Sequence, residues 1–573
     1  MNKYMPIFTR QTECQDCYKC VRSCPVKAIK IEQGVASVMD EACIYCGTCV
    51  EVCPSNAKQV RNDRQRVIDL LNTGKRVIVS LAPSWVSEFP GLSRTAMAKA
   101  FKKLGFSGVS ETALGAQEVA AHVAALLSEN PDKCFISSAC PVVVEYICKY
   151  HPEYSQNLTA LSSPLLAHCA FLRKICGEDT EIVFVGPCIA KKLESDRSNR
   201  LLHTALTFTD IHEWFEECGI DIDQPGNSGG FIPEYAAEGG LYPIDGGMIA
   251  CIKNQCTVTD NHFVSLSGMD SIISVMNTLN QIPAGRGMFL ETLACSGGCI
   301  NGPCTRDKMA TVVKRLRVLD TISQTRSNGF PRKPAIRIDR QFLPCNPEQP
   351  VYAEHQIRSV LQRTGKNSEV DELNCGGCGY NSCRELAKAI LNGRAETDMC
   401  ITYMRQLAQK KANMLVKTMP SAVVIVDNNM RIIESNRNFA RIAGKEAEQV
   451  FEVKEGMEGA VLDKVLPISH LFRRVFETGT EIVDLDVRVG AKILRCSLFV
   501  IEPQLIAGCI LNDVTKPSMK KEEIIKGTRQ VIKRNLTTVQ KIARLLGENA
   551  AETEMTLTQI IDAFKAGNTG NQK

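Results

Sequence analysis

Mostly apolar runs alternate with helical stretches from about residue 75 onward. Residues 76–82 are typical of a buried strand, and the Ala-rich stretch 114–127 has the spacing of a helix. Further apolar runs occupy residues 133–137, 181–186 and 287–291. This alternation predicts an α/β domain over residues 75–310.

The pattern changes to short strands after a helical stretch at 401–415. Residues 422–426 and 431–433 flank Asp427-Asn428-Asn429, which is a hairpin signal. Residues 481–489 alternate strictly, which predicts that Val483, Leu485, Val487 and Val489 face one side. Two more strands are predicted at 493–501 and 505–511.

The last predicted element is a helix at 518–565 with apolar residues at heptad spacing. Its apolar positions are Ile525, Ile532, Leu536, Val539, Ala543 and Leu546. Heptads of this kind suit a dimer seam or signalling helix, and one amphipathic helix packed on its own domain is the alternative.

Composition adds one unusual feature, which is the cysteine content. The chain has 573 residues, of which 44% are hydrophobic and 23% charged, as in ordinary folded proteins. A net charge of +5 is too small to predict nucleic-acid binding. The sequence contains no run of 18 or more apolar residues, so no membrane span is predicted. The N-terminus lacks the apolar core of a signal peptide, so we expect a cytoplasmic location. The 27 cysteines are therefore better explained by metal or redox chemistry than by disulfides.

Eight of these cysteines form a duplicated motif over residues 1–62. Each run has the spacing Cys-x-x-Cys-x-x-Cys-x-x-x-Cys-Pro, the first at 14–24 and the second at 43–53. This is the spacing of a bacterial two-cluster ferredoxin, in which the fourth cysteine of each run ligates the other 4Fe-4S cluster. The predicted ligand sets are Cys14, Cys17, Cys20 with Cys53, and Cys43, Cys46, Cys49 with Cys24. Zinc is the alternative, but it rarely uses eight cysteines in this pattern.

Four more cysteines follow apolar runs of the α/β region. They are Cys140, Cys188, Cys295 and Cys299. Sites in open α/β sheets form beyond the carboxyl ends of the strands, so these three loops could face one cavity and hold a further cluster.

The three loops resemble the signature motifs of the FeFe hydrogenases, in the family's order and behind a two-cluster domain. The resemblance implies a two-lobed α/β domain and an H-cluster, which is a 4Fe-4S cluster bridged to a diiron centre with CO, cyanide and azadithiolate. Cys140, Cys188 and Cys295 would hold the cube, and Cys299 would bridge it to the diiron centre. Lys191 matches the lysine that hydrogen-bonds an iron cyanide, and Glu194 matches the motif's closing glutamate. Ser228-Gly229-Gly230 resembles the family's glycine pair.

The departures from the family pattern predict slow turnover. Ala139 replaces the cysteine that relays protons in standard catalytic hydrogenases, and losing a positioned acid costs roughly 10²–10⁴-fold in rate. Gly186 and Leu293 replace two expected methionines. Of the usual acidic pair only Glu118 is present, near His122, within the segment expected to hold it. Cys304 stands at a usual glycine position, where it is either a buried structural thiol or a substitute proton relay.

A fourth cysteine motif lies beyond a basic linker or helical tail at 311–365. Cys375, Cys378, Cys383 and Cys400 fall in residues 366–402, with a Gly-rich loop and a helical segment between them. This resembles the small 4Fe-4S domain of corrinoid iron-sulfur proteins, and a zinc site is the alternative. The expected cofactors are therefore three 4Fe-4S clusters and an H-cluster.

Residues 412–516 resemble a PAS domain, including the closing Asp513-Val514-Thr515. His470 could in principle ligate haem, but we expect it to be an ordinary, partly buried histidine. The fold class expected for the whole chain is multidomain α/β and α+β.

Together these resemblances imply a sensory FeFe hydrogenase that acts on H2 and protons. Its expected partners are ferredoxin or another redox carrier, a separate kinase or phosphatase, and a second copy in a homodimer, with no nucleic acid and no membrane. One alternative is a ferredoxin-linked catalytic FeFe hydrogenase. The other is a hydrogenase-like iron-sulfur protein without a diiron centre.

Overall fold

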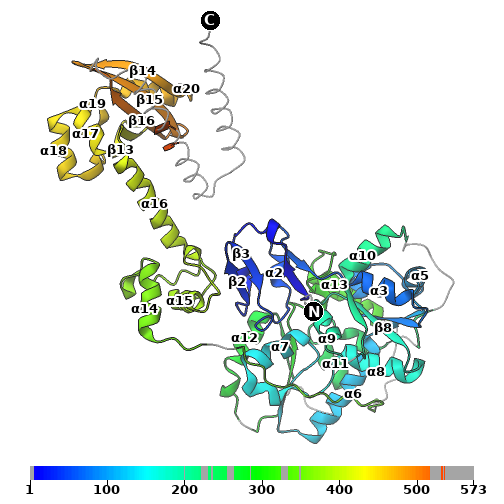
Figure 1. The fold of residues 1–573 in the computed structure, drawn as a ribbon. Helices are drawn as coiled ribbons and strands as arrows, with labels where there is room; N and C mark the ends of the chain where they lie inside the picture. Colours follow the sequence, from blue (N-terminus) through cyan, green and yellow to red (C-terminus); the bar gives the residue numbers. More distant parts are fainter. Residues whose placement is uncertain are drawn as a thin grey trace. The chain divides into compact units, whose positions relative to one another are not determined.

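The computed structural model describes residues 5–198, 200–220, 230–233, 236–254, 263–283, 285–323, 333–347, 350–515, 531–532 and 534–535. The chain forms two compact units, Met1–Met399 and Cys400–Lys573 (Figure 1). The predicted helix at 518–565 falls almost entirely outside the described residues. None of the helices in the described ranges is both long and apolar enough to cross a membrane.

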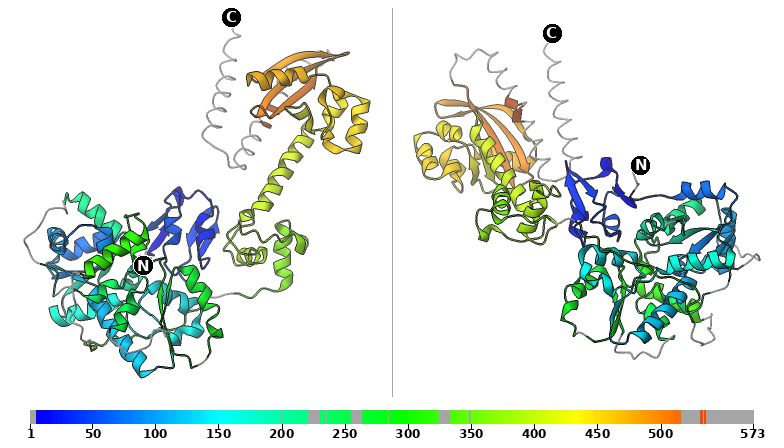
Figure 2. Two further views of the ribbon diagram at one scale, coloured as in Figure 1. Left: turned by 180° about the vertical axis from the view of Figure 1, so that it is seen from behind. Right: turned by 60° about the horizontal axis from the view of Figure 1, so that its bottom comes forward.

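The first unit begins with two small antiparallel pairs of strands. Strand β1 (Ile7–Thr9) pairs with β4 (Lys58–Val60), and β2 (Ile29–Glu32) pairs with β3 (Val35–Val38). The duplication in sequence is repeated in the structure, because short helices α1 (Lys19–Ser23) and α2 (Thr48–Glu51) each carry the third cysteine of a run. These strands lie beside the α/β part of the unit, as both views show (Figures 1 and 2).

A four-stranded parallel sheet of order β6-β5-β8-β9 forms the first α/β lobe. Its strands are β5 (Val77–Leu81), β6 (Gly108–Glu111), β8 (Glu181–Gly186) and β9 (Thr204–Thr207). The surrounding helices are α3 (Arg64–Leu71), α5 (Arg94–Lys103) and α10 (Phe208–Glu217). Every residue of β5 is buried, as the apolar run at 76–82 predicts.

The second lobe has a three-stranded parallel sheet of order β10-β11-β7. Its strands are β7 (Cys134–Ile136), β10 (Phe263–Ser267) and β11 (Met288–Leu293). Helix α6 (Ala113–Glu129), predicted at 114–127, supplies apolar side chains to this lobe's core together with α11 (Gly247–Lys253). It packs closely on α8 (Pro164–Cys176), whose leucines lie in the core of the first lobe, so the α6–α8 pair joins the two lobes.

Three parts of the predicted linker or helical tail at 311–365 pack in different places. Residues 336–340 lie along the α/β part, where Ser162 donates its amide to the Ile338 carbonyl and Arg340 donates to Ala160. Helix α14 (Glu354–Arg363) packs instead on α15 (Cys383–Leu391) of the small cysteine-rich domain. The helix at the start of the segment, α13 (Thr311–Ser323), packs on α4 (Trp85–Glu88).

The second unit begins with the long helix α16 (Ile401–Thr418) and continues into a five-stranded antiparallel sheet of order β13-β12-β16-β15-β14. The strands are β12 (Ala422–Asp427), β13 (Ile432–Ser435), β14 (Ile482–Val489), β15 (Lys492–Glu502) and β16 (Ile506–Asp513). Helices α17 (Arg437–Ala443), α18 (Lys445–Val453) and α20 (Ser469–Thr478) follow β13, and Phe439 and Phe472 from them are fully buried in its core.

Two sequence expectations in this unit are wrong. Val483 is 63% exposed, because the register of β14 shifts between Ile482 and Leu485 and Asp484 adopts a left-handed conformation. Ile482 takes the inward place instead. His470 on α20 is exposed rather than partly buried, so it faces away from the core of its own domain.

Candidate active site

Four cysteines from three strand-ending loops line one cavity between the two lobes. Cys140 follows β7 and precedes α7 (Pro141–Tyr150), Cys188 follows β8, and Cys295 and Cys299 follow β11. All four lie on the wall of the same cavity, whose volume is about 100 Å³. The structure therefore brings together every cysteine assigned to the H-cluster.

The pKa values of these thiols reflect their burial and their closeness to one another. Burial raises the pKa of Cys188 to about 11, and the charge of Cys140 adds to the rise. Burial raises the pKa of Cys295 well above its ordinary value, and the other three cysteines add to this effect. Four crowded thiolates in a dry cavity are costly unless cations neutralise them, and soft thiolates select metals such as those of iron-sulfur clusters. The donor set therefore fits a cluster. Within the described ranges, no three His, Cys, Asp or Glu side chains are arranged to hold a single metal ion.

Lys191 brings a positive charge to this wall. It lies in helix α9 (Ala190–Asp196), and its Nζ donates to Glu194 Oε2 at 2.6 Å. Glu194 also pairs with Arg340 at 3.5 Å, so the carboxylate is held from two sides. The Lys191 ammonium opposes the rise in pKa of both Cys188 and Cys299. It can therefore neutralise thiolate charge or donate to an anionic ligand.

Two hydroxyls in the cavity wall have no hydrogen-bond partner among the described residues. They are the buried Ser84 Oγ and Tyr242 Oη, and both residues line the cavity. A buried hydroxyl without a partner is costly, which indicates that a ligand with acceptor atoms belongs there. This observation supports the fit of a cofactor that carries cyanide or CO as well as sulfide. Sequence analysis missed both residues, since neither lies in a cysteine motif.

The departures from the family pattern also have structural reasons. Ala139 lines the cavity and carries no exchangeable proton. A Cβ on Gly186 would lie 2.4 Å from the Phe184 ring, so a methionine cannot replace it without repacking. Met248 of α11 lies on the cavity wall, and the Ser137 hydroxyl donates to its sulfur at 3.1 Å. A methionine is thus present from a different element, which the sequence did not predict.

Glu118 and His122 contact a crossing segment rather than the cavity. The Glu118 carboxylate accepts from the amides of Ala335 and Ile336, and His122 Nε2 pairs with the Ile336 carbonyl at 2.8 Å. Their contacts hold this segment in place. Ser228 and Gly229 lie outside the described residues.

A buried acidic residue near the site was also missed. Glu291 of β11 is fully buried, and its carboxylate accepts from the amides of Gly246 and Ile249 at 2.9 Å each. Burial raises the pKa of this carboxyl to about 7. Glu291 lies close enough to Cys299 to act on that thiol, so its protonation state matters to the site.

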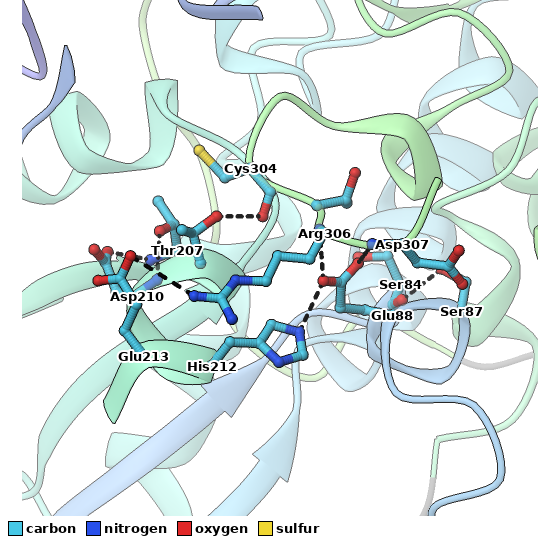
Figure 3. Close-up of polar contacts among 12 residues, drawn as sticks. Ser84, Ser87, Glu88, Thr207, Asp210, His212, Glu213, Cys304, Arg306 and Asp307 are labelled. Atoms are coloured by element: carbon cyan, nitrogen blue, oxygen red, sulfur yellow. Dashed lines mark hydrogen bonds and ion pairs between the residues drawn. The ribbon is translucent and has the colours of Figure 1, made fainter. Parts of the chain in front are cut away.

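The loop after Cys299 is anchored by Glu88. The Glu88 carboxylate accepts from His212 Nε2 at 2.9 Å and from the Arg306 amide at 2.8 Å (Figure 3). Cys304, in the same loop, is buried among Lys192, Asp210 and Cys188, and its sulfur points away from the polar contacts in Figure 3. It is not among the residues that line the cavity. These positions favour a structural thiol.

Several ferredoxin cysteines lie close enough to one another to affect each other's pKa. The charges of Cys43, Cys46 and Cys24 add to the burial that raises the pKa of Cys49. Cys14 and Cys17 act in the same way on Cys20. No described contact tests the assignment of Cys53 to the second set.

The ferredoxin domain contributes to the wall of the cavity. Cys46 lines the cavity wall, and the next residue, Gly47, has a φ of +88°. A Cβ there would lie 2.5 Å from Pro303 Cβ, so this glycine allows the ferredoxin domain to approach the active-site loop closely.

The small domain holds three of its four cysteines within the first unit. Cys375 is exposed, whereas Cys378 and Cys383 are buried, and Asn374 Oδ1 accepts from the Cys383 amide. Cys400 is buried and precedes α16 in the second unit.

Three family models match the chain. Residues 75–303 match "Iron only hydrogenase large subunit, C-terminal domain", residues 6–54 match "4Fe-4S dicluster domain", and residues 371–402 match "Putative Fe-S cluster". The last match spans all four cysteines of the small domain.

The chain is also similar to individual proteins. "Iron hydrogenase 1" of Clostridium pasteurianum is 24% identical over 299 residues, which cover 42% of this chain and 52% of that protein. The chain therefore spans about half the length of this curated relative. An FeFe-hydrogenase structure from Chlamydomonas reinhardtii shows 16% identity, covers 50% of this chain and 100% of that one, and has a TM-score of 0.38. A Rhodobacter sphaeroides LOV protein shows 16% identity over 29% of this chain and 99% of that one, with a TM-score of 0.18.

The cysteine-lined cavity and the matching domains define an iron-sulfur protein with an α/β hydrogenase-type domain. More particularly, the chain resembles the FeFe hydrogenases.

Proposed function

We propose that this protein is a sensory FeFe hydrogenase that converts H2 slowly and passes its electrons through iron-sulfur clusters. The observation that carries the proposal is the single cavity whose wall holds four thiols, Lys191 and Ala139. The first five side chains suit an H-cluster, and the sixth lacks the proton relay of rapid enzymes.

Each group of residues in the cavity would have its own role. Cys140, Cys188 and Cys295 would hold the cube, and Cys299 would be shared between the cube and the diiron centre. When bound, this cofactor supplies the site for 2H+ + 2e− ⇌ H2. Lys191 orients an anionic ligand through its ammonium, while Glu194 keeps the lysine in position at 2.6 Å. The apolar wall, which includes Leu293 and Met248, excludes water.

The second unit would read the redox state. Its five strands occur at the places predicted from the sequence, and their order β13-β12-β16-β15-β14 supports the proposed PAS domain at 412–516. The described part of its core is filled by side chains such as Phe439 and Phe472. The proposed output is a change in a separate kinase or phosphatase, with ferredoxin or another carrier as electron partner, a homodimer as the assembly and the cytoplasm as the location.

Infrared spectroscopy of the anaerobically purified, diiron-matured protein tests the proposal. We expect CO and cyanide bands that shift under H2, together with slow turnover in the same sample. Cys299→Ala should abolish the bands, whereas Cys176→Ser, which changes a half-buried thiol of α8 away from the cavity, should keep them.

Each other outcome selects an alternative. Fast turnover with the same bands would indicate a ferredoxin-linked catalytic hydrogenase. Absence of the bands despite competent maturation would indicate a hydrogenase-like iron-sulfur protein without a diiron centre. Hydrogen exchange in residues 419–515 that does not respond to H2 would contradict the sensory part.

A further inference from the structure

The small cysteine-rich domain packs directly on the ferredoxin domain. Gly379, one residue after Cys378, has a φ of +95° and lies against α1. A Cβ at this position would lie 3.0 Å from the Arg22 amide nitrogen and 3.0 Å from Val21 Cγ1. Both residues lie between the ligands Cys20 and Cys24 of the ferredoxin runs, so only a glycine lets the two cysteine loops come this close.

A second set of contacts fixes the same arrangement. The Ile31 amide of β2 donates to the Arg394 carbonyl at 3.0 Å, and the Gln33 amide donates to Glu396 Oε1 at 2.7 Å. These bonds connect the β2–β3 hairpin to the segment that follows α15. The two domains are therefore held at two separate places.

One charged side chain lies between the two cysteine sets. Lys27 is half-buried, and its Nζ donates to the Arg22 carbonyl at 3.1 Å. Cys24, Glu385 and Cys378 are all close enough to act on this ammonium. Cys24 and Cys378 therefore both lie near one cation, which would compensate negative charge on clusters held by either cysteine.

We propose that this interface is a branch of the electron route, in which the ferredoxin cube ligated by Cys24 exchanges single electrons with the cluster held by Cys375, Cys378 and Cys383. The same cube is assigned Cys46, which lines the active-site cavity, so it would have the cavity on one side and the third cluster on the other. In each step one cube is oxidised by one electron and the other is reduced by one electron. No bond breaks and no proton moves.

The inference rests on the proposed function for the physiological source of electrons, but its test does not. Dithionite can reduce the clusters without any H2 chemistry. The interface can therefore be tested even if the protein has no H-cluster. If the two clusters do not interact, the infrared test of the H-cluster is unaffected.

Electron paramagnetic resonance of the dithionite-reduced, full-length protein tests the branch. Neighbouring reduced clusters interact magnetically, and the two ferredoxin cubes already do so with each other. We therefore expect an additional splitting in the wild-type signal that is lost when Cys375→Ser and Cys378→Ser remove the third cluster. Gly379→Ala should lose the splitting at unchanged iron and sulfide content, because its methyl group wedges the loops apart. Gly393→Ala is the matched control, since Gly393 also has a positive φ but has nothing within 4 Å of its Cβ position.

A second variant covers the case in which Gly379→Ala fails to keep its cluster. Glu396→Ala removes the bond to the Gln33 amide without touching the cysteine loop, and we expect it to weaken the splitting. A fully reduced wild-type signal with no splitting beyond that of the variant lacking the third cluster overturns the proposal. So does zinc in the small domain, or a splitting that survives both substitutions.

Discussion

Two neighbouring lysines of α9 have different surroundings at the residue scale. Lys191 lines the cavity, whereas Lys192 is fully buried in the protein, where its Nζ donates to Asp63 and Asp210 at 3.1 Å each. The Lys192 ammonium helps hold the pKa of Asp63 below its ordinary value against the opposing effect of burial. The motif match singles out Lys191, but nothing in the sequence predicts the buried ion pairs of Lys192, because they depend on the direction in which that side chain leaves the helix.

We predict that Lys192→Ala lowers the free energy of unfolding by about 3–5 kcal/mol, since it leaves two carboxylates without their shared buried partner. Lys191→Ala should cost less stability, because Glu194 keeps Arg340, but it should shift the cyanide infrared bands. Chemical denaturation and infrared spectra of both variants check the contrast. Equal losses of stability with unchanged bands would contradict it.

Position 139 offers a gain of function. Ala139→Cys places an exchangeable proton on the cavity wall, and we expect turnover to rise by about 10²-fold or more with unchanged infrared bands. Ala139→Val controls for the added volume. Equal turnover in the two variants would show that protons reach the cavity by another route.

Glu291 makes stability depend on pH. Its pKa is raised from 4.5 to about 7 by burial, so the folded protein retains a proton that the unfolded chain releases. The stability associated with this proton is full below about pH 4.5 and is lost as the pH rises toward 7, by roughly 3 kcal/mol in total. Glu291→Gln should flatten the pH dependence of the melting temperature in this window, and a curve of unchanged slope would refute the assignment.

At the scale of elements, the contact between α6 and α8 is the tightest join of the two lobes. A Cβ on Gly115 would lie 2.1 Å from the Pro164 carbonyl oxygen and 2.5 Å from the His168 amide nitrogen. Gly115 has a negative φ, so steric exclusion alone explains the glycine.

Gly115→Val should therefore separate α6 from α8 and cost at least about 1–3 kcal/mol of stability. Ala125→Val on the same helix, at a half-buried position, is the control and should cost less. Thermal unfolding of the two variants measures the difference. Similar melting temperatures would show that the helix pair tolerates separation.

Secondary structure was predictable where one periodicity dominates. Strands β5, β8, β12 and β16 and helix α6 occur within a few residues of their predicted places, because fully buried or strictly alternating runs leave little choice. The irregularity at Asp484 was not predictable, since an extra residue in a strand changes no local propensity and is decided by pairing with β15. The packing of α14 on α15 likewise depends on contacts with distant residues such as Cys383.

At the scale of the whole molecule, the cysteines of the site were predictable and their surroundings were not. Cys140, Cys188, Cys295 and Cys299 could be identified because each follows an apolar run and because their loops resemble the FeFe-hydrogenase motifs. Ser84 and Tyr242 reach the cavity from outside every motif, and only the assembled fold brings them there.

The two units should respond differently to iron removal. The first unit has many cysteines that a cluster must neutralise, whereas the described core of the sheet in the second unit consists of packed side chains. Both tryptophans, Trp85 and Trp214, lie in the first unit, so their fluorescence reports on that unit alone. We expect chelation to lower its melting temperature while a transition seen by circular dichroism persists for the second unit. A common shift of both transitions would contradict this independence.

The bond from Ile31 to Arg394 has a consequence for solubility. It occupies an amide on the outer side of β2, which pairs with β3 alone among the strands that the structure describes. Unpaired strand edges are templates for addition of another chain, which leads to aggregation. The small domain therefore also acts as a cover, and a shortened chain without residues 371–399 should self-associate through this newly opened edge.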